Sequence, residues 1–226
     1  YDVRRQMFDL NDPDLGGVSR TLDFQYENLG SKRQMTILAK AACATLAFAQ
    51  LTVLNLFSNN ISDAGISALA DACAKGALAQ VTNLDLSFNS IGDAGTTALA
   101  NACTPARGAL PSLKKLQLGQ DRAGSDNQKI GDAGVSALAK ACTKGALASL
   151  KELFLDGNRI GDDGVRALAD ACTSKGGLKL LIRLFLDSNQ IGDAGISSFA
   201  DACIKGGLTQ LKELDFSDNK IGDAGR

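Results

Sequence analysis

The most regular feature of the sequence is an alternation of leucine with other residues that returns about every thirty residues. Leucines two apart point to one side of a strand, because successive side chains of a strand alternate between its two faces. The segments with this pattern begin at residues 51, 81, 113, 150, 181 and 211 and read LTVLNLFSNN, VTNLDLSFNS, LKKLQLGQD, LKELFLDGN, LIRLFLDSN and LKELDFSDN. The pattern predicts a strand in each segment, with one apolar face.

A second pattern, with helical spacing, follows each alternating segment. Ile66, Leu69 and Cys73 lie at positions i, i+3 and i+7 and form one apolar stripe. An aspartate stands before each stripe, where its carboxylate can accept hydrogen bonds from the free N–H groups of the first helical turn. These predicted N-caps are Asp63, Asp93, Asp132, Asp162 and Asp193. A Lys-Gly pair, as in AKGAL and TKGAL, is expected to end the helices, since glycine readily takes the left-handed C-terminal position.

The aliphatic residue between strand and helix measures the period of the repeat. Its successive positions are Leu29, Ile61, Ile91, Ile130, Ile160, Ile191 and Ile221, with steps of 32, 30, 39, 30, 31 and 30. A unit of this length cannot bury its own leucines, so the copies must stack side by side. Neighbouring strands pair at about 4.8 Å, whereas neighbouring helices pack at roughly 8 to 10 Å. A stack with strands on one side and helices on the other must therefore bend, with the strands on the inner side. The sequence therefore predicts an α/β solenoid, a horseshoe with a parallel β-sheet on its concave face and α-helices on its convex face.

The repeat resembles that of the leucine-rich repeat superfamily, in particular its ribonuclease-inhibitor-like class. The pattern L-x-x-L-x-L-x-x-N-x-I-G matches LKELFLDGNRIG and LIRLFLDSNQIG position by position. The resemblance covers residues 18–226 as a single domain of about seven repeats, the last incomplete, and leaves 1–17 as an N-terminal flank. It implies that one asparagine per repeat hydrogen-bonds the backbone of the neighbouring turn. These asparagines are Asn59, Asn89, Asn158, Asn189 and Asn219.

Composition and charge narrow the classes of function. With 24 basic and 25 acidic residues the net charge is −1, so there is no overall basic field of the kind that attracts nucleic acid. No apolar run reaches the roughly 18 to 20 residues that span a bilayer, and residues 1–17 lack the apolar stretch of a signal peptide. Histidine, the side chain used most often for acid and base catalysis, is absent. We therefore expect no nucleic-acid partner, no membrane insertion and no enzymatic activity.

Six cysteines recur at one position of each predicted helix: Cys43, Cys73, Cys103, Cys142, Cys172 and Cys203. Cysteines on adjacent helices lie too far apart for comfortable disulfide geometry, and no C-x-x-C motif or Cys/His cluster is present. We expect them to be small buried hydrophobes, with no metal and no cofactor. Free thiols indicate a reducing, intracellular compartment, which we expect to be the cytoplasm, or an organelle if a targeting segment precedes Tyr1.

The concave wall offers the candidate contact surface. The strand centres place these residues outward: Asp23, Asn55, Asp85, Gln117, Phe154, Phe185 and Asp215. Phe154 and Phe185 stand on adjacent strands. Because exposed rings do not contribute to the packing of one repeat on the next, we predict that they contact a partner. The charged residues assigned to the same site are Lys151, Asp156, Arg183 and Asp187. The alternative left open is that some of the phenylalanine rings, here and in the cluster near the rim, fold over neighbouring strands as local packing.

Further candidate contact residues lie near the rim. Tyr26, Phe57 and Phe88 are predicted to form a second aromatic cluster, closer to the N-terminus. Arg122 joins the candidate site from the insertion DRAGSDNQ (121–128), which is expected to be an irregular loop on one rim. These assignments place the predicted contact surface on the concave face and its edge.

The chain stops at IGDAGR, where another helix is expected to begin. One side of Leu214 and Phe216 would then stay uncovered. We expect further residues or a partner to cover this end.

The resemblance implies a function as well as a fold. Proteins of this kind bind another macromolecule through the concave face and rim and do not themselves catalyse a reaction. We therefore predict a non-catalytic protein–protein interaction scaffold, a subunit of a larger assembly or a module of a larger protein. The alternatives are an enzyme inhibitor and a GTPase-activating protein of the Ran type, for which Arg122 is the rim residue to test.

Overall fold

The computed structural model describes residues 21–44, 46–120 and 129–225. Within these residues, seven strands of three residues each form one parallel sheet in sequence order. The strands are β1 (Thr21–Asp23), β2 (Val53–Asn55), β3 (Asn83–Asp85), β4 (Lys115–Gln117), β5 (Glu152–Phe154), β6 (Arg183–Phe185) and β7 (Glu213–Asp215). Each strand pairs with the next in the same register, so the central leucines form one row from Leu22 to Leu214.

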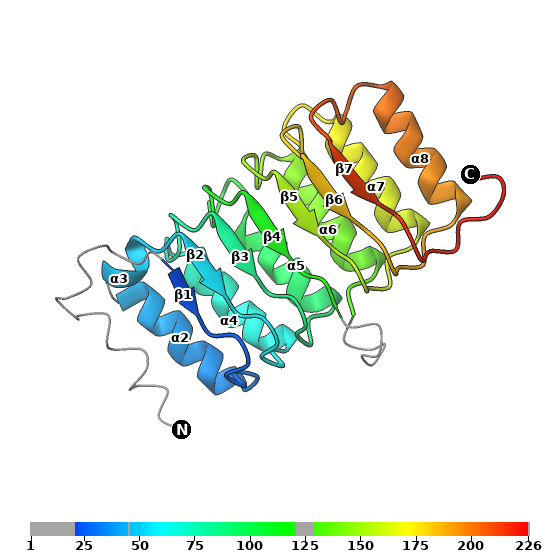
Figure 1. Ribbon diagram of the computed structural model, residues 1–226. Helices are drawn as coiled ribbons and strands as arrows, with labels where there is room; N and C mark the ends of the chain where they lie inside the picture. Colours follow the sequence, from blue (N-terminus) through cyan, green and yellow to red (C-terminus); the bar gives the residue numbers. More distant parts are fainter. Residues whose placement is uncertain (1–20, 45, 121–128, 226) are drawn as a thin grey trace.

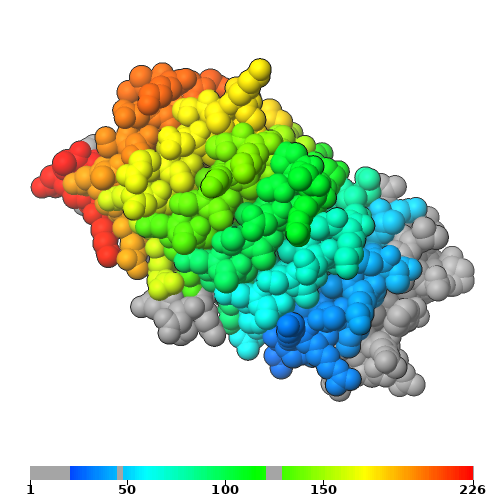
Figure 2. Space-filling view, turned by 180° about the vertical axis from the view of Figure 1, so that it is seen from behind, coloured from blue at the N-terminus to red at the C-terminus, as the bar shows by residue number. Residues whose placement is uncertain are grey.

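The helices form a second layer on one side of the sheet (Figure 1). They are α2 (Lys32–Ala44), the short α3 (Leu46–Ala49), α4 (Asp63–Cys73), α5 (Asp93–Ala102), α6 (Asp132–Thr143), α7 (Asp162–Thr173) and α8 (Asp193–Ile204). Successive long helices contact one another along the array. Figure 2 shows the molecule from behind, where the segments follow each other in chain order.

The core lies between the two layers. It contains the central strand leucines, such as Leu54 and Leu184, and helix residues such as Ile66 and Leu168. The sheet stays open, with β1 and β7 at opposite ends (Figure 1). The predicted fold class, a repeated strand–helix unit with sheet and helices on opposite sides, is confirmed.

The asparagines join each repeat to the one before it, as the resemblance implies. The Oδ1 atom of Asn89 accepts from the N–H of Ile61 at 2.8 Å, and its Nδ2 atom donates to the carbonyl of Leu56 at 2.9 Å. Asn59, Asn158, Asn189 and Asn219 make the corresponding pair of bonds to their preceding repeats. Because Asn59, Asn89, Asn158 and Asn189 are buried, their amides replace the water that the turn backbones would otherwise need.

The aspartates do not cap their own helices, and this prediction was wrong. Asp93 and Asp132 are the first helical residues of α5 and α6, the N-cap positions are Gly92 and Gly131, and neither cap makes a side-chain hydrogen bond. The same holds for α4, α7 and α8, which also begin at their aspartates. Each aspartate stands one position beyond the N-cap, and its carboxylate bonds to the neighbouring repeat instead.

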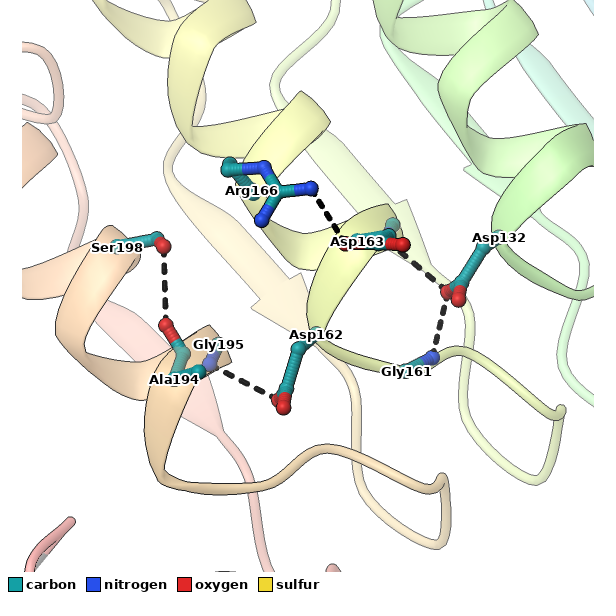
Figure 3. A network of polar contacts seen from close by, with 9 residues as sticks. Asp132, Gly161, Asp162, Asp163, Arg166, Ala194, Gly195 and Ser198 are labelled. Atoms are coloured by element: carbon teal, nitrogen blue, oxygen red, sulfur yellow. Dashed lines mark hydrogen bonds and ion pairs between the residues drawn. The ribbon is translucent and has the colours of Figure 1, made fainter.

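Each aspartate accepts hydrogen bonds from the start of the following helix instead. Asp132 Oδ1 accepts from the N–H groups of Gly161 and Gly164, at 2.6 and 3.0 Å (Figure 3). The same bonds run from Asp63 to Gly92, from Asp93 to Gly131 and Gly134, from Asp162 to Gly192 and Gly195, and from Asp193 to Gly222. We call this series the aspartate ladder. It places a negative charge at the positive end of the next helix dipole.

The aspartate ladder explains why glycines follow and precede the aspartate in the motif Gly-Asp-Ala-Gly. A Cβ atom on Gly134 would lie 2.7 Å from Asp93 Oδ1, closer than such atoms approach. The first repeat has Ser31 in place of the aspartate, and the second repeat has Ser62 in place of the N-cap glycine. Where no carboxylate approaches the N-cap, serine replaces its glycine, whereas Gly65 is retained because a Cβ there would lie 2.8 Å from Ile61 and 3.0 Å from Met35.

The cysteines match the prediction only in the middle of the array. Cys73, Cys103, Cys142 and Cys172 are buried and free, and burial raises the pKa of each thiol to about 12. Cys43 on α2 and Cys203 on α8 are exposed, contrary to the prediction. Both lie on helices at the ends of the helix layer, where a neighbour covers only one side (Figure 1).

The last strand is also less covered than the others. Leu214 is 42% exposed, whereas Leu184, its equivalent in β6, is 1% exposed. Phe216 is half-buried, because it packs edge-on against Phe199 of α8 with ring centroids 5.2 Å apart. Leu186, the equivalent of Phe216 in the preceding repeat, is 0% exposed, so both Leu214 and Phe216 are less covered than their equivalents, as predicted.

Candidate functional site

The side of the sheet that faces away from the helices, which we call the sheet face, carries rows of outward side chains. The middle row consists of the third residue of each strand: Asp23, Asn55, Asp85, Gln117, Phe154, Phe185 and Asp215. In β1, β2, β3 and β7 this residue accepts a hydrogen bond from the N–H two residues later, at 2.8 to 3.1 Å. This short-range bond supports the turn that leaves the strand.

Phe154 and Phe185 occupy the same row in β5 and β6, where a phenyl ring offers no such acceptor. Their rings stack almost in parallel, with centroids 4.9 Å apart and 8° between the planes. Lys115 Nζ lies 4.9 Å from the Phe154 centroid. Both rings are half-buried. The two phenylalanines therefore face outward as predicted, and they also pack locally, as the alternative proposed.

A row of paired charges runs beside this stack along the first residues of β4 to β7. Lys115 lies 3.9 Å from Glu152, and Glu152 lies 3.2 Å from Arg183. Arg183 Nε lies 3.0 Å from Glu213 Oε2. Positive and negative side chains thus alternate across four strands and compensate one another. Lys115 is a site residue that the sequence reasoning missed, although its place beside Glu152 follows from the common register of the strands.

Asp156 and Asp187 follow β5 and β6, and both are half-buried. Burial, followed by the negative charges of Asp187, Asp85 and Asp215, raises the pKa of the Asp156 carboxyl, and a backbone hydrogen bond opposes this shift. The Asp156 carboxylate fits here because residue 119, two positions after β4, is glycine, and a Cβ atom there would lie 2.5 Å from that carboxylate. These acids are therefore close enough to influence one another across several strands.

The second predicted cluster is present at the ends of β1 to β3. The Tyr26 and Phe57 rings meet edge-on with centroids 5.5 Å apart, and the Phe57 and Phe88 centroids are 4.9 Å apart. We call these three rings the aromatic strip. Tyr26 is 69% exposed and Phe88 is 43% exposed. The aromatic strip is thus more accessible than the Phe154–Phe185 stack.

Two rings of the aromatic strip stand on left-handed backbone. The φ angle is 63° at Tyr26 and 57° at Phe88, in a region that bulky side chains rarely adopt. Smaller residues take the equivalent left-handed position in other repeats: Ser58, Gly157, Ser188 and Asp218. Two large aromatic residues therefore occupy a position for which glycine, which has no Cβ, is best suited, and which smaller side chains fill in the other repeats.

The remaining predicted site residues are separated from these groups. Lys151 is exposed just before β5. Arg122 lies outside the described residues. The structure thus divides the predicted site into the aromatic strip on β1 to β3 and the stack with its charges on β4 to β7.

Two classes of site find no support in the part of the chain that the structure describes. There, no group of three or more Cys, Asp or Glu side chains could hold a metal ion. Nor is any helix of that part long and apolar enough to cross a membrane.

Comparison with known proteins identifies the repeat. A model described as leucine-rich repeat matches residues 50–70, 81–100, 125–139, 146–169, 178–200 and 207–226, more than half of the chain. No curated protein matches the sequence significantly.

Solved structures show a distant likeness in fold. Actin-binding site 2 of leiomodin-1 is 16% identical over 60% of this chain and 69% of that chain, with a TM-score of 0.45. The internalin inlF from Listeria monocytogenes is 21% identical over 90% of this chain and 62% of that chain, with a TM-score of 0.36. A chain in an octameric complex of Latrophilin 3, Unc5D and FLRT2 is 21% identical over 76% of this chain and 55% of that one, with a TM-score of 0.33. The chain therefore spans less than two thirds of the last two structures.

Proposed function

Because the chain belongs to the leucine-rich repeat family, we propose that it is a non-catalytic scaffold that binds another protein through the sheet face and its rim. In this proposal the protein acts as a subunit of an assembly or as a module of a larger protein. The free buried thiols are consistent with work in a reducing, intracellular compartment. The ribonuclease-inhibitor-like class of the repeat stays a prediction.

The aromatic strip is the observation that carries the proposal. A left-handed conformation costs a residue with a side chain roughly 1 to 2 kcal/mol. Tyr26 and Phe88 are 69% and 43% exposed, so burial within the fold offsets only part of that cost. Aromatic side chains at protein interfaces contribute strongly to affinity, because they bury a large area with few rotatable bonds. Contact with a partner accounts for rings in these positions.

In this proposal the Phe154–Phe185 stack belongs to the same binding surface and contributes less to affinity than the aromatic strip. The stack is half-buried, and its flat outer side extends the sheet face beyond the aromatic strip. Glu152 and Arg183 beside it are paired with each other, so they supply orientation more than affinity. We place the centre of binding on the aromatic strip and its edge on the stack.

Substitution of the aromatic strip tests this proposal. Immobilised wild-type protein and the variant Tyr26→Ser/Phe88→Ser are compared for the proteins that each retains from a lysate of the native source. Each candidate partner is then purified, and its Kd is measured for both forms. We expect the variant to bind its partner at least about tenfold more weakly, because interface aromatic residues commonly contribute more than 1 kcal/mol each.

A matched control removes exposed apolar side chains from the helices. Ile37 on α2 is 42% exposed and Ile204 on α8 is 84% exposed. The variant Ile37→Ser/Ile204→Ser should bind the partner as the wild type does. If Tyr26→Ser/Phe88→Ser folds normally by circular dichroism and keeps wild-type affinity for every partner, the proposed binding surface is wrong.

A further inference from the structure

We infer that the partner segment lying on the aromatic strip is cationic, with arginine or lysine side chains interleaved with large apolar ones. This inference rests on the proposed function and specifies the chemistry of the partner. It follows from the charges around the aromatic strip, from the bonds that those charges make, and from the spacing of the strands.

Carboxylates surround the aromatic strip, and no neighbouring cation on these strands offsets them. Asp23 and Glu27 are exposed, and Asp85 is half-buried. The outward first and third residues of β1 to β3 include no lysine and no arginine: Thr21, Asp23, Val53, Asn55, Asn83 and Asp85. On β4 to β7, by contrast, Lys115 and Arg183 each lie beside a glutamate. On β1 to β3, therefore, no outward lysine or arginine of the strands balances the negative charge around the aromatic strip.

The fold does not require these charges. Asp23 and Asp85 each accept one hydrogen bond from the backbone two residues later, at 3.1 and 2.9 Å. Asn55, between them on β2, makes the same bond to Phe57 at 3.0 Å with a neutral amide. Since an amide oxygen supports this turn equally well, the charge of the two aspartates is available for another purpose. An incoming cation is the group that a surplus carboxylate attracts.

The acidic character continues along the sheet face. The charge of Asp85 contributes to the raised pKa of Asp156, together with burial and with the charges of Asp187 and Asp215. A cation bound along this band would relieve the mutual repulsion of these carboxylates. Asp156 and Asp187 therefore extend the proposed contact from the aromatic strip towards the Phe154–Phe185 stack.

The geometry fits one short segment. Strands lie about 4.8 Å apart, so the aromatic strip spans roughly 10 Å and the band from Asp23 to Asp187 spans roughly 24 Å. An extended segment covers about 3.3 Å per residue, so roughly seven to nine residues reach across the band. Guanidinium groups stack on aromatic faces and bind carboxylates through paired hydrogen bonds, so arginine suits both parts of the surface.

Nine-residue peptides test the inference directly. The probes are a labelled peptide of three Arg-Leu-Gly units and two matched peptides with Gln or Glu in place of Arg, measured by fluorescence anisotropy at low and physiological salt. We expect affinity in the order Arg, Gln, Glu, and a loss of Arg-peptide affinity as salt rises. Asp23→Asn/Asp85→Asn removes two exposed charge pairs and should weaken binding of the Arg peptide by about twofold to thirtyfold.

A control variant separates the site from net charge. Asp170 and Asp201 are exposed on α7 and α8, so Asp170→Asn/Asp201→Asn removes the same charge from the helix layer. It should leave Arg-peptide affinity unchanged. Equal weakening by both pairs of substitutions, equal affinity for the Glu peptide, or no measurable binding of the Arg peptide would each overturn the inference.

The natural partner distinguishes failure of the inference from failure of the proposed function. If the partner is lost on Tyr26→Ser/Phe88→Ser and is insensitive to Asp23→Asn/Asp85→Asn, the surface is correct and its cationic specificity is wrong. If the partner tolerates both variants, the proposed surface itself is wrong.

Discussion

On β1 to β3 the sheet face leaves aromatic rings and carboxylates in solvent, whereas on β4 to β7 the two rings stack on each other and the charges at the starts of the strands are paired. Phe154 stacks on Phe185, and Glu152 lies between Lys115 and Arg183. Tyr26 and Phe88, by contrast, are exposed and stand on left-handed backbone. Both regions have the same strands, register and leucine row, so the backbone does not cause this difference. It resides in the outward side chains of the strands, which can vary without loss of the core.

The largest expected loss of stability comes from substitutions in the core, and it tests whether the two regions share one core. Leu54 in β2 and Leu184 in β6 occupy the same repeat position and are 0% and 1% exposed. Replacing either leucine with alanine should lower the free energy of unfolding by about 2 to 5 kcal/mol, because each leaves a cavity. Urea unfolding of the two variants measures this. A cost below about 1 kcal/mol in one region only would mean that the cores differ as well as the surfaces.

The next effect tests how the two regions are joined. Asp93 accepts hydrogen bonds from Gly131 and Gly134 at 2.7 and 2.8 Å and so connects α5 with α6 across the insertion. Asp93→Ala should cost about 1.5 to 3 kcal/mol, the range for hydrogen bonds to a charged group. Asp93→Asn keeps an acceptor oxygen and should cost less. Equal costs for Ala and Asn, measured by urea unfolding, would contradict the geometry of the aspartate ladder.

A smaller effect distinguishes the two aromatic groups. Phe185→Ser should destabilise the fold by about 1 to 2 kcal/mol, since it removes a stacked ring and part of its buried area. Phe88→Ser should change the free energy of unfolding by less than about 1 kcal/mol, because the ring is 43% exposed and loses its contact with Phe57, while Ser58 and Ser188 already fill the same left-handed position in other repeats. Thermal or urea unfolding of both variants compares them. A larger loss for Phe88→Ser would show that the aromatic strip is structural.

The smallest effect concerns charge. Glu152→Gln removes one partner from both Lys115 and Arg183 and should cost at most about 1 kcal/mol, less at high salt, since the pairs are partly exposed. Asp85→Asn should cost close to nothing, because Asn55 already serves the same turn. Unfolding at low and high salt measures both. A clear loss for Asp85→Asn would mean that its charge has a role in the fold.

Much of the fold follows from the sequence because the same pattern of strand and helix positions recurs in successive repeats. The alternating leucines, the register of the strands and the role of Asn89 all follow from one period and one neighbour relation. The site is less predictable. Phe154 and Phe185 are adjacent as expected, yet the cation over Phe154 belongs to Lys115, on the preceding strand and 39 residues before it in the chain.

The misassigned aspartates show where local reasoning fails. An aspartate at the start of a helix usually accepts hydrogen bonds from that helix. In an array of stacked repeats, the start of the neighbouring helix lies equally close. The sequence does contain the signal, since Ser62 replaces glycine in the one matching repeat that follows a repeat without the aspartate. The left-handed position of Tyr26 and Phe88 has a similar signal in Gly157, which occupies the same place in a later repeat.

The aspartate ladder also determines how the protein can be shortened. Each carboxylate accepts hydrogen bonds from equivalent glycine N–H groups at the start of the following helix, so the contacts between repeats are interchangeable. Excision of residues 132–161 would bring Gly131 directly before Asp162 and offer Asp93 the N–H groups of Gly131 and Gly164. Deletion of one whole repeat therefore preserves the hydrogen bonds between the remaining repeats, whereas deletion of half a repeat would leave one aspartate without its N–H donors.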